Sequence, residues 1–336
     1  MASLGWFGLG LPEAYGGMGL GFRELALLYE ELGSFLTPLP TAATLLAADA
    51  ILAAGSDAQK RRWLAPLAAG EIRAGFALPT AAVEMPQLGD GNVLSGTLTD
   101  VLQGDQVDEL VVPVLGAGGR LSLAVVGASQ PGVEVRPRPI IDLTRTLADV
   151  SFSEVRIGPE RVMTLEPRTW TRLLDHASLA IACDAVGGAG RILADTVTYL
   201  GVRRQFDRPI GAFQALKHRV ASWKIAVEAA GALTRHCAEL IADGEHSRSA
   251  LSSAAKASAT ETYLKVAGDA VQLHGGIGFT WEHDCHLFLK RAALDAVLFG
   301  GVMQHKDRAA ELAFGGVLGI RTREHVPLQR FFSRPD

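Results

Sequence analysis

Residues 199–214 read Y-L-G-V-R-R-Q-F-D-R-P-I-G-A-F-Q and connect two long apolar patterns of helical period. The stretch places a cationic end on the first helix, interrupts the chain between Asp207 and Pro209, and opens the second helix near Gly211. A break of this kind, with arginines at the end of a helix, is a suitable place to hold an anion. The stretch therefore predicts a helical bundle with an anion-binding turn at one end.

The C-terminal half continues this helical pattern. Apolar stripes run through three long segments, residues 173–200, 213–243 and 247–273. Each segment has Ala, Gly and Ser where neighbouring helices would approach closely, and a shorter helical pattern follows Trp281. The motif Gly187-Gly188-Ala189-Gly190 lies within a helical pattern and follows no strand, so it favours close helix packing over a dinucleotide-binding loop.

The N-terminal half predicts helices followed by strands. One helix covers residues 22–32 and closes at Gly33, and a second covers residues 41–54. The spacing of Ser56 and Gln59 is typical of a capping box at the start of a third. Beyond residue 75 the apolar runs shorten and alternate with turns rich in Gly, Pro, Asp and Asn, as in an antiparallel sheet or small barrel.

The predicted fold class is therefore α+β. A shortened N-terminal helical domain precedes a middle antiparallel β-domain and a C-terminal four-helix bundle. The predicted boundaries are residues 1–75, 76–160 and 161–316, followed by a basic tail at 317–336.

Composition narrows the class of protein. Among 336 residues, 48% are hydrophobic and 20% are charged, which is typical of a soluble globular chain. The net charge of -4 provides no electrostatic footprint for nucleic acid or for an anionic membrane. The start of the chain lacks the basic segment of a secretion signal, and isolated cysteines are typical of reduced thiols, so we expect a cytoplasmic protein.

No metal site is expected. The three cysteines Cys183, Cys237 and Cys285 are too widely spaced for a zinc site. His283, Asp284, Cys285 and His286 are adjacent, and adjacent residues of a helix point in different directions, so they would not converge on one ion.

Five motifs, in this order along the chain, resemble the acyl-CoA dehydrogenases. They are L-G-W-F-G-L-G-L-P-E-A-Y-G-G-M-G-L at 4–20, L-Y-E-E-L-G at 28–33, Q-K-R-R-W-L at 59–64, R-R-Q-F-D-R-P-I-G-A-F-Q at 203–214 and Q-L-H-G-G-I-G-F-T at 272–280. The resemblance implies a flavoprotein, usually a tetramer built as a pair of dimers, that oxidises an acyl-CoA across its α and β carbons. Its electrons would pass to an electron-transfer flavoprotein or a similar acceptor.

In that family FAD lies at a dimer interface, with the flavin ring against the β-domain of one subunit and the ADP portion against the bundle of its neighbour. A guanidinium suits the pyrophosphate, and glycines let a backbone approach the cofactor closely. The alternative to a cofactor role is a purely structural one, in which Arg203 is a cation at a helix end and Gly275 and Gly276 only terminate a helix. The FAD-binding positions that the resemblance implies are Arg203, Phe206, Gln214, Gln272, Leu273, Gly275 and Gly276.

The β-domain departs from the family pattern. Where the family has a T-E-P-x-A-G-S-D type segment, residues 77–82 read A-L-P-T-A-A. Where it has W-I-T or W-I-S beside the flavin ring, residues 99–103 read T-D-V-L-Q. The flavin-facing surface of this chain's own β-domain is therefore expected to be degraded.

The catalytic base is also missing where the resemblance would place it. The family's Y-E-G-T corresponds to L-F-G-G at residues 298–301, so Gly300 stands in place of the acid. The family's alternative base, on the first bundle helix, aligns with Ala177 or Ser178, and neither side chain can remove a proton. The remaining candidates for the base are Asp175 and His176, near Ala177 and Ser178, and Asp295, on the helix before Gly300.

These departures suggest that the chain lends its ADP-side residues to the FAD of a partner subunit. Such a division resembles the α2β2 acyl-CoA dehydrogenases of actinobacteria that shorten steroid side chains. Two alternatives stay open: an active homo-oligomer with Asp295 or Asp175 as a displaced base, and a flavin-free scaffold or acyl-CoA-binding protein. Family members normally carry a few dozen residues before the L-G-W segment, so the resemblance also implies a truncated chain or an open acyl pocket.

Overall fold

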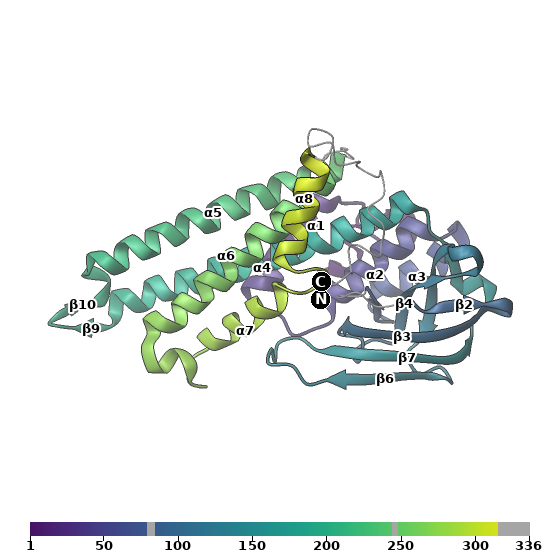
Figure 1. Ribbon diagram of the computed structural model, residues 1–336, viewed down its shortest axis with the longest axis horizontal. Helices are drawn as coiled ribbons and strands as arrows, with labels where there is room; N and C mark the ends of the chain where they lie inside the picture. Colours follow the sequence, from purple (N-terminus) through teal and green to yellow (C-terminus); the bar gives the residue numbers. More distant parts are fainter. Residues whose placement is uncertain (79–84, 244–247, 315–336) are drawn as a thin grey trace.

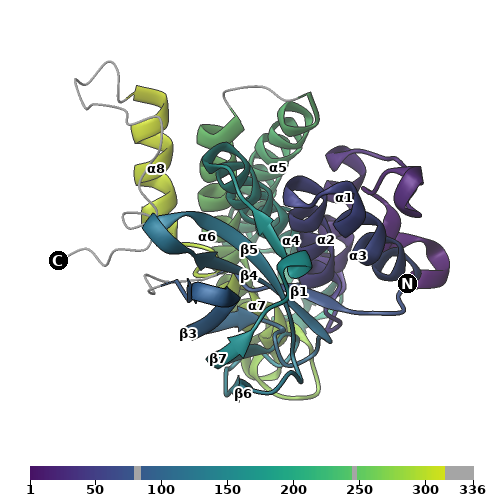
Figure 2. The same cartoon turned by 90° about the vertical axis from the view of Figure 1, so that its right-hand side faces the viewer.

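The computed structural model describes residues 1–78, 85–243 and 248–314. Three short 3-10 turns lead into the N-terminal helices α1 (Phe22–Ser34), α2 (Thr41–Ala54) and α3 (Asp57–Ala69). The predicted capping box is confirmed, because Gln59 N donates to Ser56 Oγ at 3.4 Å and Ser56 N donates to Gln59 Oε1 at 2.8 Å. Helix α1 packs against the first bundle helix and α2 packs against the first strand, so these helices join the other two parts (Figure 2).

The middle of the chain forms a sheet with strand order β6-β7-β3-β2-β4-β5-β8. Its strands are β1 (Ala74–Phe76), β2 (Gln87–Gly89), β3 (Val93–Leu102), β4 (Glu109–Leu115), β5 (Leu121–Gly127), β6 (Val133–Arg138), β7 (Leu147–Arg156) and β8 (Val162–Thr164). Most pairs are antiparallel, as predicted, but β1 and β2 each pair with β4 in parallel, so the sheet is mixed. The three residues of β1 are all buried, and so short a run carries no alternation from which its partner could be read.

The sheet separates two apolar cores. Along β4, Val111 joins the large core shared with the helices, whereas Leu110, Val112 and Val114 join a second core on the other face of the sheet. This alternation follows from the two-residue period of a strand. The sheet is therefore fixed to the helical part through one of its faces.

The C-terminal part contains α4 (Pro167–Val202), α5 (Gln214–Asp243), α6 (Arg248–His274), α7 (Cys285–Asp295) and α8 (Val302–Phe314). The three long helices confirm the prediction, and a further helix, α8, follows α7 among the described residues. Figure 1 shows the long helices extending away from the sheet, with the turn between α4 and α5 at the far tip. The order of elements is the predicted one: helices, sheet, helical bundle.

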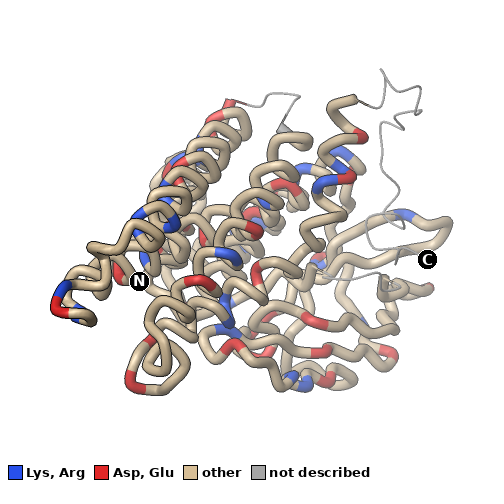
Figure 3. Tube along the Cα trace, turned by 60° about the vertical axis from the view of Figure 1, so that its left-hand side comes forward, with Lys and Arg blue, Asp and Glu red and all other residues tan. Residues whose placement is uncertain are grey.

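Glycines let α4 approach its neighbours closely, as predicted. A Cβ atom at Gly187 would lie 1.8 Å from the Glu30 carbonyl oxygen of α1, and one at Gly188 would lie 2.4 Å from the ring of Tyr263 in α6. Helix α4 is long and apolar enough to cross a membrane, but 83% of its most apolar window is buried inside the protein. Together with these contacts, that burial identifies α4 as the central helix of the fold. Acidic and basic residues are interspersed along the described chain rather than gathered by sign (Figure 3).

Candidate functional site

The turn between α4 and α5 is a small exposed hairpin. Its strands β9 (Arg204–Gln205) and β10 (Arg208–Pro209) pair antiparallel, and Ile210 N donates to Arg203 O at 2.8 Å. At its tip, Phe206 and Asp207 have left-handed backbone conformations with φ of 52° and 61°. Such conformations are uncommon outside glycine, so the hairpin holds a specific local shape at some cost in backbone strain.

The hairpin presents cations and an aromatic ring to the outside. Arg203 is exposed, and no acidic side chain of the described residues pairs with it. Phe206 is 85% exposed, although its ring meets that of Phe213 edge-on at 6.0 Å. The Arg208 guanidinium lies 4.1 Å from the centroid of the Phe213 ring, a cation–π contact that supports the hairpin.

The second predicted segment follows the end of α6. Gly275 has φ of 65° and opens a 3-10 turn over Gly275–Phe279. A Cβ atom at Gly275 or Gly276 would meet nothing within 4 Å, so open space borders the backbone there. Gln272 is exposed beside this turn, whereas Leu273 packs against the core and supports it from inside.

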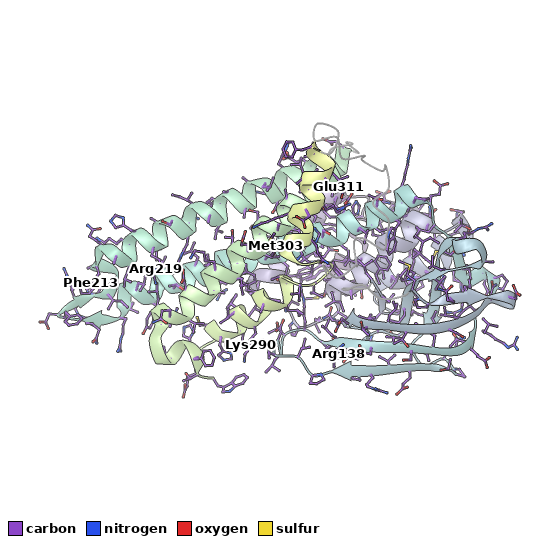
Figure 4. The ribbon with its side chains drawn as sticks, viewed as in Figure 1. Arg138, Phe213, Arg219, Lys290, Met303 and Glu311 are labelled. Atoms are coloured by element: carbon purple, nitrogen blue, oxygen red, sulfur yellow. The ribbon has the colours of Figure 1, made fainter. Side chains whose placement is uncertain are left out.

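The structure brings both segments to one end of the bundle. Tyr199, in the last turn of α4, stacks on His274, the last residue of α6, with ring centroids 4.3 Å apart. Gln214 begins α5 directly after the hairpin. This end lies far from the sheet: Phe213 stands at the tip of the bundle, and Arg138 belongs to the sheet (Figure 4). Six of the seven predicted positions are thus exposed at this end of the bundle, with Leu273 packed behind them, and this end lies away from the chain's own sheet.

An apolar groove of about 650 Å3 lies beside the hairpin, between the C-terminal half of α4 and the start of α5. Leu193, Val197, Leu200, Leu216 and Val220 contribute to its walls, and the residues around it include Lys217 and Lys224.

The sheet carries charge in residues 99–103, the segment that replaces the family's W-I-T or W-I-S. Asp100 lies at an irregularity in the β3–β7 pairing and has φ of 59°. It forms an ion pair of 3.2 Å with Arg138, which also lies 3.4 Å from Asp149. Gln103 is only 1% exposed, and its Nε2 donates to the Leu39 carbonyl at 2.8 Å. Of the other departing segment, residues 79–82 lie outside the described chain, and Ala77 and Leu78 are buried.

The backbone at Gly300 adopts a tight left-handed turn. Phe299 has φ of 54° and Gly300 has φ of 109°. The buried Lys256 Nζ donates to the carbonyls of Gly300 at 3.2 Å and Asp295 at 2.7 Å, and His305 Nε2 donates to the Phe299 carbonyl at 3.0 Å. Burial lowers the pKa of Lys256 to about 8 and that of His305 to about 3. The turn is therefore held from inside the protein and requires glycine at position 300.

Asp295, a candidate base, is fully buried in an ionic network. Arg145, just before β7, donates to Asp295 at 2.6 Å and to Asp184 of α4 at 2.8 Å. Burial, and then the neighbouring Asp184, raise the pKa of Asp295 well above the ordinary carboxyl value. Asp295 Oδ2 receives no hydrogen bond from a donor among the described residues, which fits a carboxyl that carries a proton.

The other candidates for a base are also committed to structural partners. Asp175 is fully buried and forms a 2.7 Å ion pair with Arg308. His176 Nδ1 lies 2.8 Å from Asp49, and the Ser178 hydroxyl donates to the Leu174 carbonyl at 2.7 Å. Ala177 has no polar group. Each of these side chains faces the protein interior.

The network around Arg145 was not predicted from the sequence. Arg291 completes it through contacts with Asp142 at 3.1 Å and Asp184 at 3.3 Å. The sequence does show charged residues inside apolar helical stripes, which indicates buried charges: Asp184 in I-A-C-D-A-V at 181–186 and Lys256 in A-A-K-A-S at 254–258. Among the described residues, no group of three His, Cys, Asp or Glu side chains is arranged to hold a metal ion, and the three cysteines are free and buried.

Comparison with known proteins gives matches over most of the chain. The family model for the N-terminal domain of acyl-CoA dehydrogenases matches residues 1–71, and that for the C-terminal domain matches residues 168–309. The acyl-CoA dehydrogenase IpdE2 of Mycobacterium tuberculosis is 34% identical over 84% of this chain and 75% of its own length.

Two similar solved structures are of proteins whose names join two components. One is a variant of the steroid acyl-CoA dehydrogenase Tcur3481-Tcur3483, with 30% identity, a TM-score of 0.86, and coverage of 94% of this chain and 88% of that one. The other is the ChsE4-ChsE5 complex of Mycobacterium tuberculosis, with 26% identity, a TM-score of 0.86, and coverage of 93% and 86%.

Proposed function

Because the chain belongs to the acyl-CoA dehydrogenase family, we propose that it works as one subunit of a heteromeric FAD-dependent acyl-CoA dehydrogenase. In this proposal it supplies the ADP side of the cofactor site to a partner subunit and carries no catalytic base of its own. The observation that carries the proposal is the contrast between the two ends of the molecule. The bundle tip suits a bound cofactor, whereas the sheet and the Gly300 turn do not suit catalysis.

The residues at the bundle tip fit the pyrophosphate and adenosine portion of FAD. Arg203 offers a forked, permanently charged donor set in solvent, and Phe206 offers an exposed ring. Gly275 and Gly276 leave open space beside the backbone, as a closely approaching ligand requires. Because this surface points away from the chain's own sheet, a cofactor held there would meet the sheet of another subunit (Figure 1).

The chain's own sheet does not fit a flavin ring. The ion pair between Asp100 and Arg138 lies in the segment that replaces the family's W-I-T or W-I-S, and a carboxylate cannot stack on a flavin ring as an indole can. Gln103, close by in sequence, turns inward to the Leu39 carbonyl and offers no donor to a ligand. These contacts support a subunit pair in which the sheet of this chain binds no flavin.

The reaction needs a carboxylate that takes the α proton of the acyl thioester while the β hydride leaves to the cofactor. Gly300 provides no such group, and Asp295 and Asp175 are fully buried in ion pairs. A base must also reach its substrate, so the geometry does not favour an active homo-oligomer with either residue as the displaced base. The base would therefore come from the partner subunit.

The similar proteins suggest the class of substrate and partner. One similar structure is that of a steroid acyl-CoA dehydrogenase, and another is that of a complex of two named components. We extend this to a steroid-derived acyl-CoA as substrate, a second acyl-CoA dehydrogenase subunit as partner, and an electron-transfer flavoprotein or similar acceptor in the cytoplasm.

The proposal is tested by capturing the full chain through a tag from its native cells and comparing it with the chain purified alone. The captured complex should show flavin absorbance and acyl-CoA dehydrogenase turnover, and the chain alone should show neither at stoichiometric level. Arg203→Ala should release FAD from the complex, whereas Arg61→Ala, an exposed arginine of α3, should leave FAD bound. Stoichiometric FAD with turnover in the chain alone would refute the proposal.

A further inference from the structure

One aromatic contact joins the two segments that face the cofactor in the proposed function. Tyr199 and His274 stack with ring centroids 4.3 Å apart and an interplanar angle of 26°. The Tyr199 hydroxyl also donates to the His274 carbonyl at 3.2 Å. Arg203 follows Tyr199 by one helical turn, with Arg203 N donating to Tyr199 O at 2.9 Å, and Gly275 follows His274 directly.

We propose that His274 is a positioning residue for FAD. Through its stack on Tyr199, it holds the 203–209 hairpin and the Gly275–Phe279 turn in one arrangement. This inference rests on the proposed function, since it assigns a role to a residue between two cofactor segments. His274 does not itself touch the reacting atoms.

The hydrogen bonds of His274 specify a neutral ring. Its side chain is 3% exposed, and its Nδ1 lies 2.8 Å from the Ala270 carbonyl, which can only accept. Nδ1 therefore carries the hydrogen. Nε2 is buried and has no hydrogen-bond partner among the described residues. Protonation would place a second N–H in a buried position without an acceptor, and an unsatisfied buried donor is costly.

The groups around His274 have opposite effects on its pKa. The His283 ring, in the loop before α7, lies 4.5 Å away, and Cys285 Sγ of α7 lies 3.8 Å from Nδ1. Cys285 N donates to His283 Nδ1 at 3.1 Å, so that nitrogen is already engaged. Burial lowers the pKa of His274 and His283 lowers it further, whereas the Ala270 carbonyl and Asp195 of α4 raise it.

The sign of the pH dependence follows from these contacts. The folded protein binds a proton at His274 less readily than the unfolded chain, whose histidine pKa is about 6.5. The stability that neutral His274 contributes is therefore complete above about pH 6.5 and is lost as the pH falls below that value. Acid should therefore weaken the stack of His274 on Tyr199 and, with it, the binding of FAD.

The test measures FAD retention in the complex captured through this chain, by flavin fluorescence after gel filtration between pH 7.5 and pH 5.5. His274→Ala, which removes the stack, should lower FAD affinity about five- to tenfold at pH 7.5. His274→Phe keeps an aromatic ring that cannot be protonated, so it should retain FAD at pH 7.5 and lose less FAD than the wild type at pH 5.5. His236→Ala, an exposed histidine of α5, is the matched control and should behave as the wild type.

The outcomes separate this inference from the proposed function. If Arg203→Ala keeps its FAD, the proposed function fails. If Arg203→Ala loses FAD but His274→Ala retains it at every pH, or His274→Phe loses it in acid as the wild type does, the positioning role fails. Thermal unfolding of each variant shows whether a loss of FAD reflects a loss of fold. If His274→Ala does not fold, the acid profile of His274→Phe decides.

Discussion

At the scale of single residues, the structure gives physical reasons for positions that looked like losses in the sequence. Gly300 replaces an acid of the family pattern, and its φ of 109° belongs to a backbone region that favours glycine. Lys256 and His305 hold the carbonyls of Gly300 and Phe299 from the interior. Position 300 therefore lies in a turn whose backbone favours glycine and which is held from the interior.

Replacement of Gly300 should be costly, even by alanine. We expect Gly300→Ala to lower the free energy of unfolding by about 1–3 kcal/mol because of backbone strain. Gly301→Ala is the matched control, since a Cβ atom there would make only an ordinary 3.7 Å contact with Gln304. Denaturant unfolding of both variants measures the difference. Equal stability would show that the turn does not require glycine at 300.

For the same reason, Gly300→Glu should not convert the isolated chain into a dehydrogenase. The restored carboxylate would sit on a strained backbone, and the sheet would still present Asp100 and Arg138. Bleaching of flavin absorbance by acyl-CoA, in the chain supplied with FAD, measures this directly. Flavin reduction by that variant alone would contradict the account.

Asp295 offers a second test at this scale. An asparagine is neutral, like the protonated acid, and of similar size, so Asp295→Asn should keep both the fold and the dehydrogenase turnover of the complex. Asp295→Ala should lower the free energy of unfolding by about 3–5 kcal/mol, because the buried Arg145 would lose one of the carboxyl groups that it pairs with. Loss of turnover in a folded Asp295→Asn complex would instead identify Asp295 as a base.

At the scale of elements, close contacts between helices decide how the bundle meets the N-terminal part. Gly187 lies against the backbone of α1, whereas a Cβ atom at Gly190, one turn later on α4, would meet nothing within 4 Å. We expect Gly187→Ala to destabilise the protein by about 1–3 kcal/mol through overpacking. Gly190→Ala should be neutral or stabilise by up to about 1 kcal/mol through helix propensity. Thermal and denaturant unfolding compare the pair, and equal effects would argue against the α1–α4 contact.

Elements were predictable from the sequence where local chemistry specifies them. The Ser56–Gln59 capping box, the long helical stripes and the packing role of Gly187 and Gly188 are all local patterns, and the structure confirms them. The parallel pairing of β1 with β4 was not predictable, because a buried three-residue strand has no period to read.

The ionic network was beyond local reasoning for a different reason. Arg145 and Asp295 are 150 positions apart, and Arg291 and Asp142 are 149 apart. A single sequence shows that a charge lies in an apolar stripe but not which partner will neutralise it. The stack of Tyr199 on His274 joins two predicted segments, and neither motif by itself predicts the contact.

At the scale of the whole molecule, the surface with the predicted cofactor residues and the sheet lie at opposite ends (Figure 1). A single copy of the chain cannot enclose a cofactor between them. The apolar groove of about 650 Å3 beside the hairpin also lies at the bundle tip. In the proposed function, the bundle tip of this chain binds FAD together with a partner subunit, and the sheet of this chain binds no flavin.

The amount of FAD per polypeptide in the captured complex tests this division most directly. Flavin absorbance and quantitative amino-acid analysis of the complex give the ratio. If this chain lends its bundle tip to a partner and its own sheet holds no flavin, the complex should contain one FAD for each pair of unlike chains. One FAD for every polypeptide, or a full complement of FAD in the chain purified alone, would contradict the account.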